Sequence, residues 1–330
     1  MASFFRRTVP SAALLVLGLV ALLVVGVGGV AIAKMGGGSS SWSSASAAGG
    51  SSWGGAGTTA ATGGSTIVAQ VGGQVMFDST VNATAQLPAG QTTFNVSTPD
   101  AAGHTLLLVH LADGLAISQF LADLTAVNSN STSGQQNATS QVDNLGGAMV
   151  NSTCSVSFTE SLAAGTYDLI DFKGTGIADQ HPKVQVLQVS GTTATATSPT
   201  VESRIQLTDT NGQPRFVTPT TLPADGTFAV SNNTTNTNET AFLPLKPGTT
   251  AADLHKYFAS FGSAGASWQS APFAGAACGL APLNPGHQAV VHISTKPGRY
   301  VVASFALGPK TNKREAQLGM YQQINFVMAS

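Results

Sequence analysis

Residues 87–97 read LPAGQTTFNVS, and residues 222–231 read LPADGTFAVS. Both stretches pass from a Leu-Pro-Ala turn into an alternating segment that contains a Phe. The match continues without a gap as far as LADG at 111–114 and LKPG at 245–248. A repeat of about 130 residues predicts two similar domains, because solenoid repeats are only about 20–50 residues long.

The repeat extends to a Gly-x-Tyr segment near the end of each copy. Residues 163–172 read AAGTYDLIDF, and residues 296–305 read KPGRYVVASF. Between the two matching ends, each copy has a segment with apolar residues at three- and four-residue spacing, at 115–124 and 250–258. This spacing predicts a short helix in each copy. Thr249 is the expected N-cap of the second helix.

Outside these helices, the chain from residue 66 onward favours short antiparallel strands. β-branched and aromatic residues are separated by Gly, Pro and Asn, which is typical of strands joined by turns. Several such strands in each copy predict an all-β fold, with a Greek-key β-sandwich in each domain. The expected strands include 105–111, 156–160, 166–172, 184–189, 227–230, 289–294 and 299–305.

These features together resemble the exported cupredoxin-like domains. The resemblance rests on an early strand with a His or Asn, a Leu-x-x-Gly turn before a short helix, and a late Gly-x-Tyr strand followed by Gly319-Met320. It implies two tandem cupredoxin-like β-sandwiches, the first at 66–190 and the second at 201–330. A Thr/Ser/Ala-rich linker at 191–200 would join them. In the family, one end of the sandwich holds copper through His, Cys, His and often Met.

The resemblance assigns three residues of the first copy to the copper-ligand positions. The early His is His104, the Cys position is Asp171, and the later His is His181, while Val186 stands near the place of the axial Met. Two imidazoles and a carboxylate suit Cu(II), Zn or Fe(II) if the fold brings them together. The alternative, which we favour, makes the histidines loop residues and Asp171 a turn or pairing residue.

The second copy departs further from the ligand pattern. The early His position is Asn238, the Cys position is Ser304, and the later His region reads Lys-Arg-Glu at 313–315, whereas Met320 is present. Type 1 copper requires a thiolate, which neither copy supplies at that position. We therefore expect no type 1 copper and no resident cofactor, with copper at a modified site as the alternative.

The two cysteines lie elsewhere in their copies, Cys154 before a strand and Cys278 in a long loop. A disulfide between them is permitted outside the cytoplasm and would join the two domains. Two separate buried thiols are the alternative. Two cysteines are too few for a disulfide-rich scaffold or a four-Cys zinc site.

The N-terminal region predicts that the protein is located at a membrane. An apolar run from 12 to 33 follows Arg6 and Arg7, and it is long enough to cross the bilayer core. We expect a cytoplasmic tail at 1–9, a single-pass anchor at 10–33 and a Gly/Ser-rich stalk at 34–65, with the bulk of the chain outside the cell. A cleaved signal peptide, and hence a secreted protein, is the alternative, because Ala-Ile-Ala precedes Lys34.

Composition excludes several classes of function. Charged residues make up 9% of the chain, with 14 Lys and Arg and a net charge of −1, so there is no basic stripe for nucleic acid. No nucleophile elbow, zinc-protease helix or phosphate loop is present, so we expect no enzyme. His287 and His292 lie five apart in a strand, on opposite faces, and form no metal site.

The sequence therefore predicts a surface protein anchored in the membrane by its N-terminal helix. Its expected function is binding or structural, toward an extracytoplasmic or surface partner that the sequence does not identify. Two alternatives remain open at this point: a copper-binding or electron-transfer protein with a modified metal site, and a subunit of a surface filament or layer.

Overall fold

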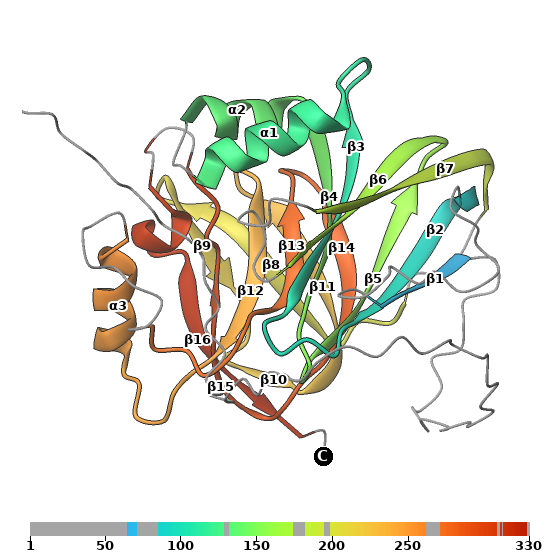
Figure 1. Ribbon diagram of the computed structural model, residues 1–330. Helices are drawn as coiled ribbons and strands as arrows, with labels where there is room; N and C mark the ends of the chain where they lie inside the picture. The colour runs from blue at the N-terminus through green and yellow to red at the C-terminus, as the bar shows by residue number, and fades with distance from the viewer. Residues whose placement is uncertain are drawn as a thin grey trace, which may run out of the picture.

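The structure is a computed structural model that describes residues 65–70, 85–128, 132–173, 182–194, 199–261, 271–308, 311 and 313–328. The expected anchor at 10–33 and the stalk at 34–65 therefore lie outside the described residues, apart from Ser65. For convenience, residues 65–194 are called the first half and residues 199–328 the second half. Figure 1 shows a molecule built mostly of strands, with α1 and α2 along one edge and α3 at one side.

The first half contains seven strands and two helices within its described residues. They are β1 (Ser65–Gln70), β2 (Ala85–Ser97), β3 (His104–Leu111), α1 (Ile117–Asn128), α2 (Thr132–Ser140), β4 (Val142–Val150), β5 (Ser155–Leu162), β6 (Gly165–Lys173) and β7 (Lys183–Ala194).

The second half contains nine strands, one α-helix and one short 3₁₀ helix within its described residues. They are β8 (Ser203–Thr210), β9 (Gln213–Val217), β10 (Thr221–Pro223), β11 (Asp225–Asn233), β12 (Asn238–Pro244), α3 (Ala251–Ala259), β13 (Cys278–Leu283), β14 (Gln288–Ser294), β15 (Gly298–Ala303), η2 (Glu315–Leu318) and β16 (Tyr321–Val327). The all-β expectation is confirmed, and each expected strand overlaps an observed one.

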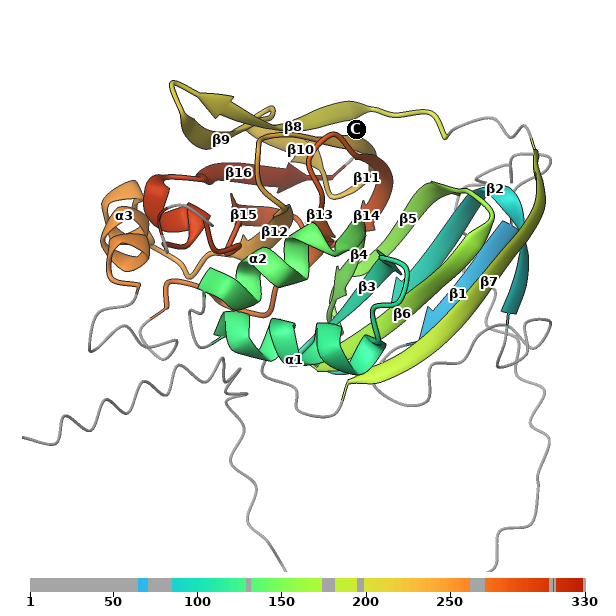
Figure 2. The ribbon, with the colours of Figure 1, turned by 90° about the horizontal axis from the view of Figure 1, so that it is seen from above.

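One continuous path of hydrogen-bonded strands runs through both halves. Within the described residues its order is β10-β16-β15-β12-β13-β4-β3-β6-β7-β2-β5-β14-β11-β8-β9, and β1 pairs with β2. The path passes between the halves twice, through β4 with β13 and through β5 with β14. Figure 2 shows the two groups of strands side by side, with β4 and β14 near the middle. The sequence predicted a linker between the halves but not these shared ladders.

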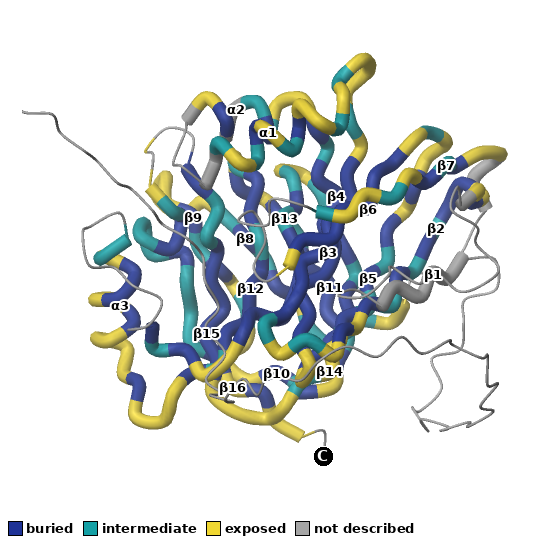
Figure 3. The backbone as a smooth tube through the Cα atoms, viewed as in Figure 1, coloured by how far each residue is buried: buried dark blue, intermediate teal, exposed yellow. Residues whose placement is uncertain are grey.

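Strand alternation explains how the interior is filled. In β5 the buried positions are Val156, Phe158, Glu160 and Leu162, at every second residue, because successive side chains point to opposite faces of a strand. The rings of Phe94 and Phe158 stack with centroids 4.6 Å apart. These apolar residues belong to one cluster that continues into the second half, and Figure 3 shows the buried backbone running through the centre of the molecule.

The helices cover the outer faces of the strands. Phe120 of α1 packs in one cluster with Leu107 and Val109 of β3, and Phe258 of α3 packs in another with Leu243 of β12. Both helices thus shield a hydrophobic strand face that would otherwise meet water.

Two local expectations need correction. The N-cap of α3 is Thr250, not Thr249, because the Thr250 hydroxyl accepts the Asp253 N–H and the Asp253 carboxylate accepts the Thr250 N–H, which completes a capping box. The helix α2 was not predicted, since its sequence TSGQQNATS resembles a polar loop. Tertiary contacts hold it: Ala138 packs in the cluster around Phe120, and Asn137 Nδ2 donates to Asp123 Oδ1 at 3.2 Å.

Several backbone pairings recur at matching places in the two halves. Leu87 of β2 pairs in parallel with Val189 of β7, and Leu222 of β10 pairs in parallel with Phe326 of β16. The strand β1 lies parallel to β2, as β8 lies parallel to β11. The repeated sequence is therefore accompanied by repeated strand pairing.

Two glycines have matching roles in β4 and β13. Gly147 and Gly279 share a φ of 138°. A Cβ at Gly147 would strike the carbonyl oxygen of Leu106, and one at Gly279 would strike that of Thr240. Leu106 and Thr240 are matching positions in the sequence repeat. Only glycine tolerates both the backbone conformation and the close approach.

The tyrosines of the two Gly-x-Tyr segments also make matching bonds. Tyr167 Oη donates to the carbonyl oxygen of Ala163 at 3.0 Å, and Tyr300 Oη donates to that of Lys296 at 2.9 Å. Each bond closes the corner before the strand and fixes where that strand starts. The positions four residues later, Asp171 and Ser304, are thereby fixed as well.

Candidate functional site

The two described residues of the expected metal set in the first half lie against each other. His104 is the first residue of β3 and Asp171 lies in the neighbouring β6. His104 Nδ1 is 2.8 Å from Asp171 Oδ1, and both side chains are buried. The sequence predicted only that the fold could bring them together.

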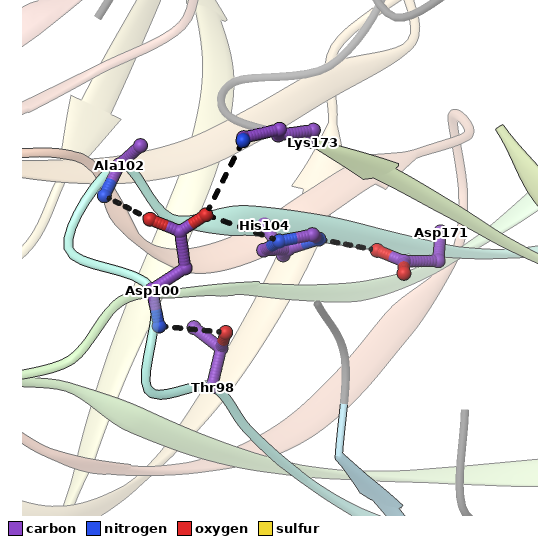
Figure 4. A network of polar contacts seen from close by, with 6 residues as sticks. All are labelled: Thr98, Asp100, Ala102, His104, Asp171 and Lys173. Atoms are coloured by element: carbon purple, nitrogen blue, oxygen red, sulfur yellow. Dashed lines mark hydrogen bonds and ion pairs between the residues drawn. The ribbon is translucent and has the colours of Figure 1, made fainter. Parts of the chain in front are cut away.

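A second carboxylate faces the other ring nitrogen of His104, as Figure 4 shows. Asp100 Oδ2 lies 3.7 Å from His104 Nε2 and 3.8 Å from Lys173 Nζ. Asp100 is itself held, because its Oδ1 accepts the Ala102 N–H at 2.8 Å. The imidazole is therefore flanked by oxygen atoms on both sides.

These contacts do not fit type 1 copper. The carboxylate of Asp171 stands where the resemblance assigns a thiolate, and His104 Nδ1 is engaged by that carboxylate. Trigonal copper of this class needs a sulfur ligand. His181 lies outside the described residues. Among the residues that the structure describes, no three His, Cys, Asp or Glu side chains are grouped as a metal site.

The matching positions of the second half form a neutral hydrogen-bonded pair. Ser304 Oγ donates to Asn238 Oδ1 at 2.8 Å, and both residues are fully buried. Asn238 Nδ2 also donates to Thr234 Oγ1 at 2.9 Å. Met320, the candidate axial residue, is buried within the apolar cluster of the interior.

Two acidic residues lie close to this neutral pair, the partly buried Glu239 and the fully buried Glu315. Glu239 accepts the Phe305 N–H at 2.7 Å, and Asn236 Nδ2 donates to Glu315 Oε1 at 2.7 Å. Burial raises the pKa of both carboxyls above the usual value, although these hydrogen bonds act in the opposite direction. The side chains of this site are engaged mainly with one another, although Oε2 of Glu315 is buried without a hydrogen-bond partner.

The cysteines join the two halves. Cys154 and Cys278 form a disulfide with Cα atoms 6.1 Å apart. Both side chains are buried. In the described residues no cysteine thiol remains free for a metal.

Another pair of side chains connects the halves through charge. His287 Nε2 lies 2.9 Å from Asp143 Oδ1. This contact lowers the pKa of the Asp143 carboxyl and raises the pKa of the His287 imidazole. Sequence reasoning assigned no role to His287, because Asp143 is far away along the chain.

The remaining carboxyl that sequence reasoning missed is Glu160 of β5. It occupies an inward-facing position between Phe158 and Leu162. Burial raises its pKa well above the usual value, and the negative charge of Asp143 adds to the effect. The sequence does indicate that Glu160 is buried, because strand alternation places it on the same face as Val156 and Phe158.

Comparisons with known proteins give only remote similarities. No family model matches the chain, and no curated protein matches it. Auracyanin A, a blue copper protein of *Chloroflexus aurantiacus*, is 20% identical over 39% of this chain and 100% of its own, with a TM-score of 0.28. A multicopper oxidase is 10% identical over 80% of this chain and 88% of its own, with a TM-score of 0.22.

A copper-containing nitrite reductase from *Thermus scotoductus* is 10% identical over 80% of this chain and 61% of its own, with a TM-score of 0.20. The expectation that the chain is not an enzyme is contradicted by these comparisons, since an oxidase and a reductase are among the similar structures. At these TM-scores the likeness is too slight to transfer any activity to this chain.

Among the helices of the described residues, none is long and apolar enough to cross a bilayer.

Proposed function

We propose that the chain is a membrane-tethered, extracytoplasmic protein with two tandem cupredoxin-like units, and that it serves at the cell surface in binding or structure without type 1 copper. The observation that carries this proposal is the direct contact between His104 and Asp171, repeated by Asn238 and Ser304. In both units, a side-chain hydrogen bond occupies the place that the resemblance gives to copper ligands.

The two-unit arrangement is supported by features that recur at matching positions. They are the parallel pairing of β2 with β7 and of β10 with β16, the paired glycines of β4 and β13, and the two tyrosine corners. Chance similarity of short motifs would not reproduce the same kinds of contact in the same order along both halves.

Export is supported by the sequence and by the cysteines. The apolar run at 12–33 follows two arginines, which favours retention of the N-terminus in the cytoplasm. Disulfides such as Cys154–Cys278 persist mainly in oxidising compartments.

The membrane tether is tested by adding protease to intact cells, which should release a fragment of nearly full size. A mature protein that begins at Lys34 in the medium would contradict the anchor.

The absence of type 1 copper is tested by adding Cu(II) to the full chain purified in detergent. We expect no intense visible band from a thiolate–copper bond, because Asp171 and Ser304 carry no sulfur. An Asp171→Cys variant is the matched control, since it places a thiolate at the assigned position beside His104. An intense blue colour in the unmodified protein would overturn the proposal.

A second candidate function, copper binding at a modified site without a thiolate, is favoured by the two carboxylates, of Asp100 and Asp171, that lie beside the ring of His104. If the unmodified protein binds Cu(II) without the thiolate band, a His104→Ala, His181→Ala double variant should lose that binding, and Met320→Ala should keep it. The affinity should fall below about pH 6, because protonated imidazoles are not ligands. Unchanged binding in the double variant would exclude this site.

A further inference from the structure

A cavity of about 450 Å³ lies where the two halves meet, beside the pairing of β5 with β14. Its lining includes Glu160 and Asp143 from the first half and His287 and Gln288 from the second. Its size falls within the range of about 300–1,000 Å³ that is typical of small-molecule sites. Because both halves contribute to it, the cavity exists only when the two halves are joined.

One lining residue of the cavity has a carboxyl oxygen without a partner. Glu160 is only 7% exposed, and its Oε1 is buried without a hydrogen-bond partner. A buried polar atom that lacks a partner is energetically unfavourable. At the matching position of the second half, Ile293 is fully buried among apolar residues. The interior at this place therefore accepts an apolar side chain, and packing alone does not require a glutamate.

The other ionisable side chains of the cavity contact neighbouring side chains. Asp143 Oδ1 is engaged by His287 Nε2 at 2.9 Å and by Asn284 Nδ2 at 3.3 Å. The ring of His110 lies against that of Tyr167, with centroids 5.2 Å apart. The described residues that line the cavity include no Lys and no Arg. Glu160 thus lacks a fixed cation from the protein.

We propose that this cavity binds a small organic cation, whose primary ammonium group pairs with Oε1 of Glu160. An ammonium supplies both the positive charge and the hydrogen-bond donors that this oxygen lacks. His110 and the His287–Asp143 pair line the same cavity, and Gln288 lies exposed among the lining residues. The rest of the ligand would contact these polar groups.

The test is calorimetric titration of the full chain in detergent at pH 7 with three amines and their neutral counterparts. The probes are ethanolamine against ethane-1,2-diol, 1,4-diaminobutane against butane-1,4-diol, and glucosamine against glucose. We expect at least one amine to bind saturably and at least tenfold more tightly than its counterpart. Glu160→Gln should weaken the binding of that amine at least tenfold, since it keeps the shape of the side chain but cannot ionise to pair with the ammonium.

Two further variants make the result specific. Asp168→Asn changes a buried carboxyl of β6 that does not line the cavity. The affinity of this variant for the amine should stay within twofold of the affinity of the unmodified protein. Gln288→Lys introduces a cation at an exposed lining position, where it should compete with the amine and weaken its binding. This variant tests the proposal even if Glu160→Gln fails to fold. Absence of saturable binding by all three amines, or equal affinity in Glu160→Gln, would overturn the proposal. Either outcome would leave the copper question untouched, because His104 and Asp171 do not line the cavity.

Discussion

The two halves of the chain keep the same contact at their matching positions but build it from different groups. His104 and Asp171 in the first half correspond to Asn238 and Ser304 in the second, and each pair is joined at 2.8 Å. The first pair consists of ionisable groups and the second of neutral ones. A buried amide and hydroxyl carry no charge, so the second half keeps the contact without any ionisable group.

The same contrast appears at Glu160 and Ile293. These residues precede Tyr167 and Tyr300 by the same spacing, and both face the interior. The second half fills the position with an apolar side chain, and the first half places there a carboxyl whose Oε1 has no hydrogen-bond partner. A buried polar residue is a candidate for function when the matching position of the other half is apolar. The apolar residue shows which kind of side chain the packing of the interior favours at that position.

The largest expected effect concerns the bond that joins the halves. Replacing Cys154 and Cys278 by Ala should lower the free energy of unfolding by about 5 kcal/mol, because the disulfide closes a loop of more than 100 residues in the unfolded chain. Denaturant titration under oxidising conditions measures the change. Each single variant should cost about as much as the double variant, since all three break one bond. A loss below about 1 kcal/mol would mean that the strand ladders alone hold the halves together.

Exchanging the residues at 160 and 293 tests whether the two positions are equivalent in packing. Ile293→Glu should lower the free energy of unfolding by about 3 kcal/mol, because it buries a charge without a partner. Glu160→Ile should raise it by about 1–3 kcal/mol, because it removes an unsatisfied buried group. Thermal and denaturant unfolding measure both. If Glu160→Ile destabilises the protein, the carboxyl has a structural partner and the two positions are not equivalent in packing.

Much of the fold could be predicted because it is encoded locally. Alternation marks β5 and the Gly-x-Tyr segments mark β6 and β15, so these strands follow from short stretches of sequence. The helix α2 could not be predicted, because its polar sequence is held by contacts with α1. The ladders between β4 and β13 and between β5 and β14 join distant segments, and no local pattern indicates which strand edges meet.

The contact between His104 and Asp171 and the cavity around Glu160 also differ in how far they could be predicted from the sequence. His104 and Asp171 could be named together only through the resemblance to cupredoxins, since nothing in their separation indicates contact. The cavity around Glu160 could not be predicted at all. It depends on His287 reaching Asp143 from the other half, which follows from the ladder between β4 and β13, where Leu283 lies opposite Leu145, rather than from either segment alone.

The smallest expected effect is the pH dependence of the contact between His287 and Asp143. The raised pKa of His287 adds stability that is present below the unfolded value and is lost as pH rises through the folded value. The lowered pKa of Asp143 adds stability that is present above its unfolded value and is lost as pH falls through the folded value. The pair should therefore stabilise the protein most between about pH 4 and pH 6.5.

A His287→Gln variant isolates this contribution, because the amide fills much of the same space without a titrating charge. His110 and Asn284 also act on Asp143, and both remain in the variant. The difference in the free energy of unfolding between the two proteins, measured by denaturant titration from pH 3 to pH 9, should be largest inside the window and should shrink on both sides. We expect a maximum of about 0.5 kcal/mol, since both side chains are partly exposed and the pair is screened by solvent. His255→Gln is the matched control, because its exposed ring contacts the hydroxyl of Tyr321. A difference that stays constant across the range would show that the two halves are not held together by charge at this contact.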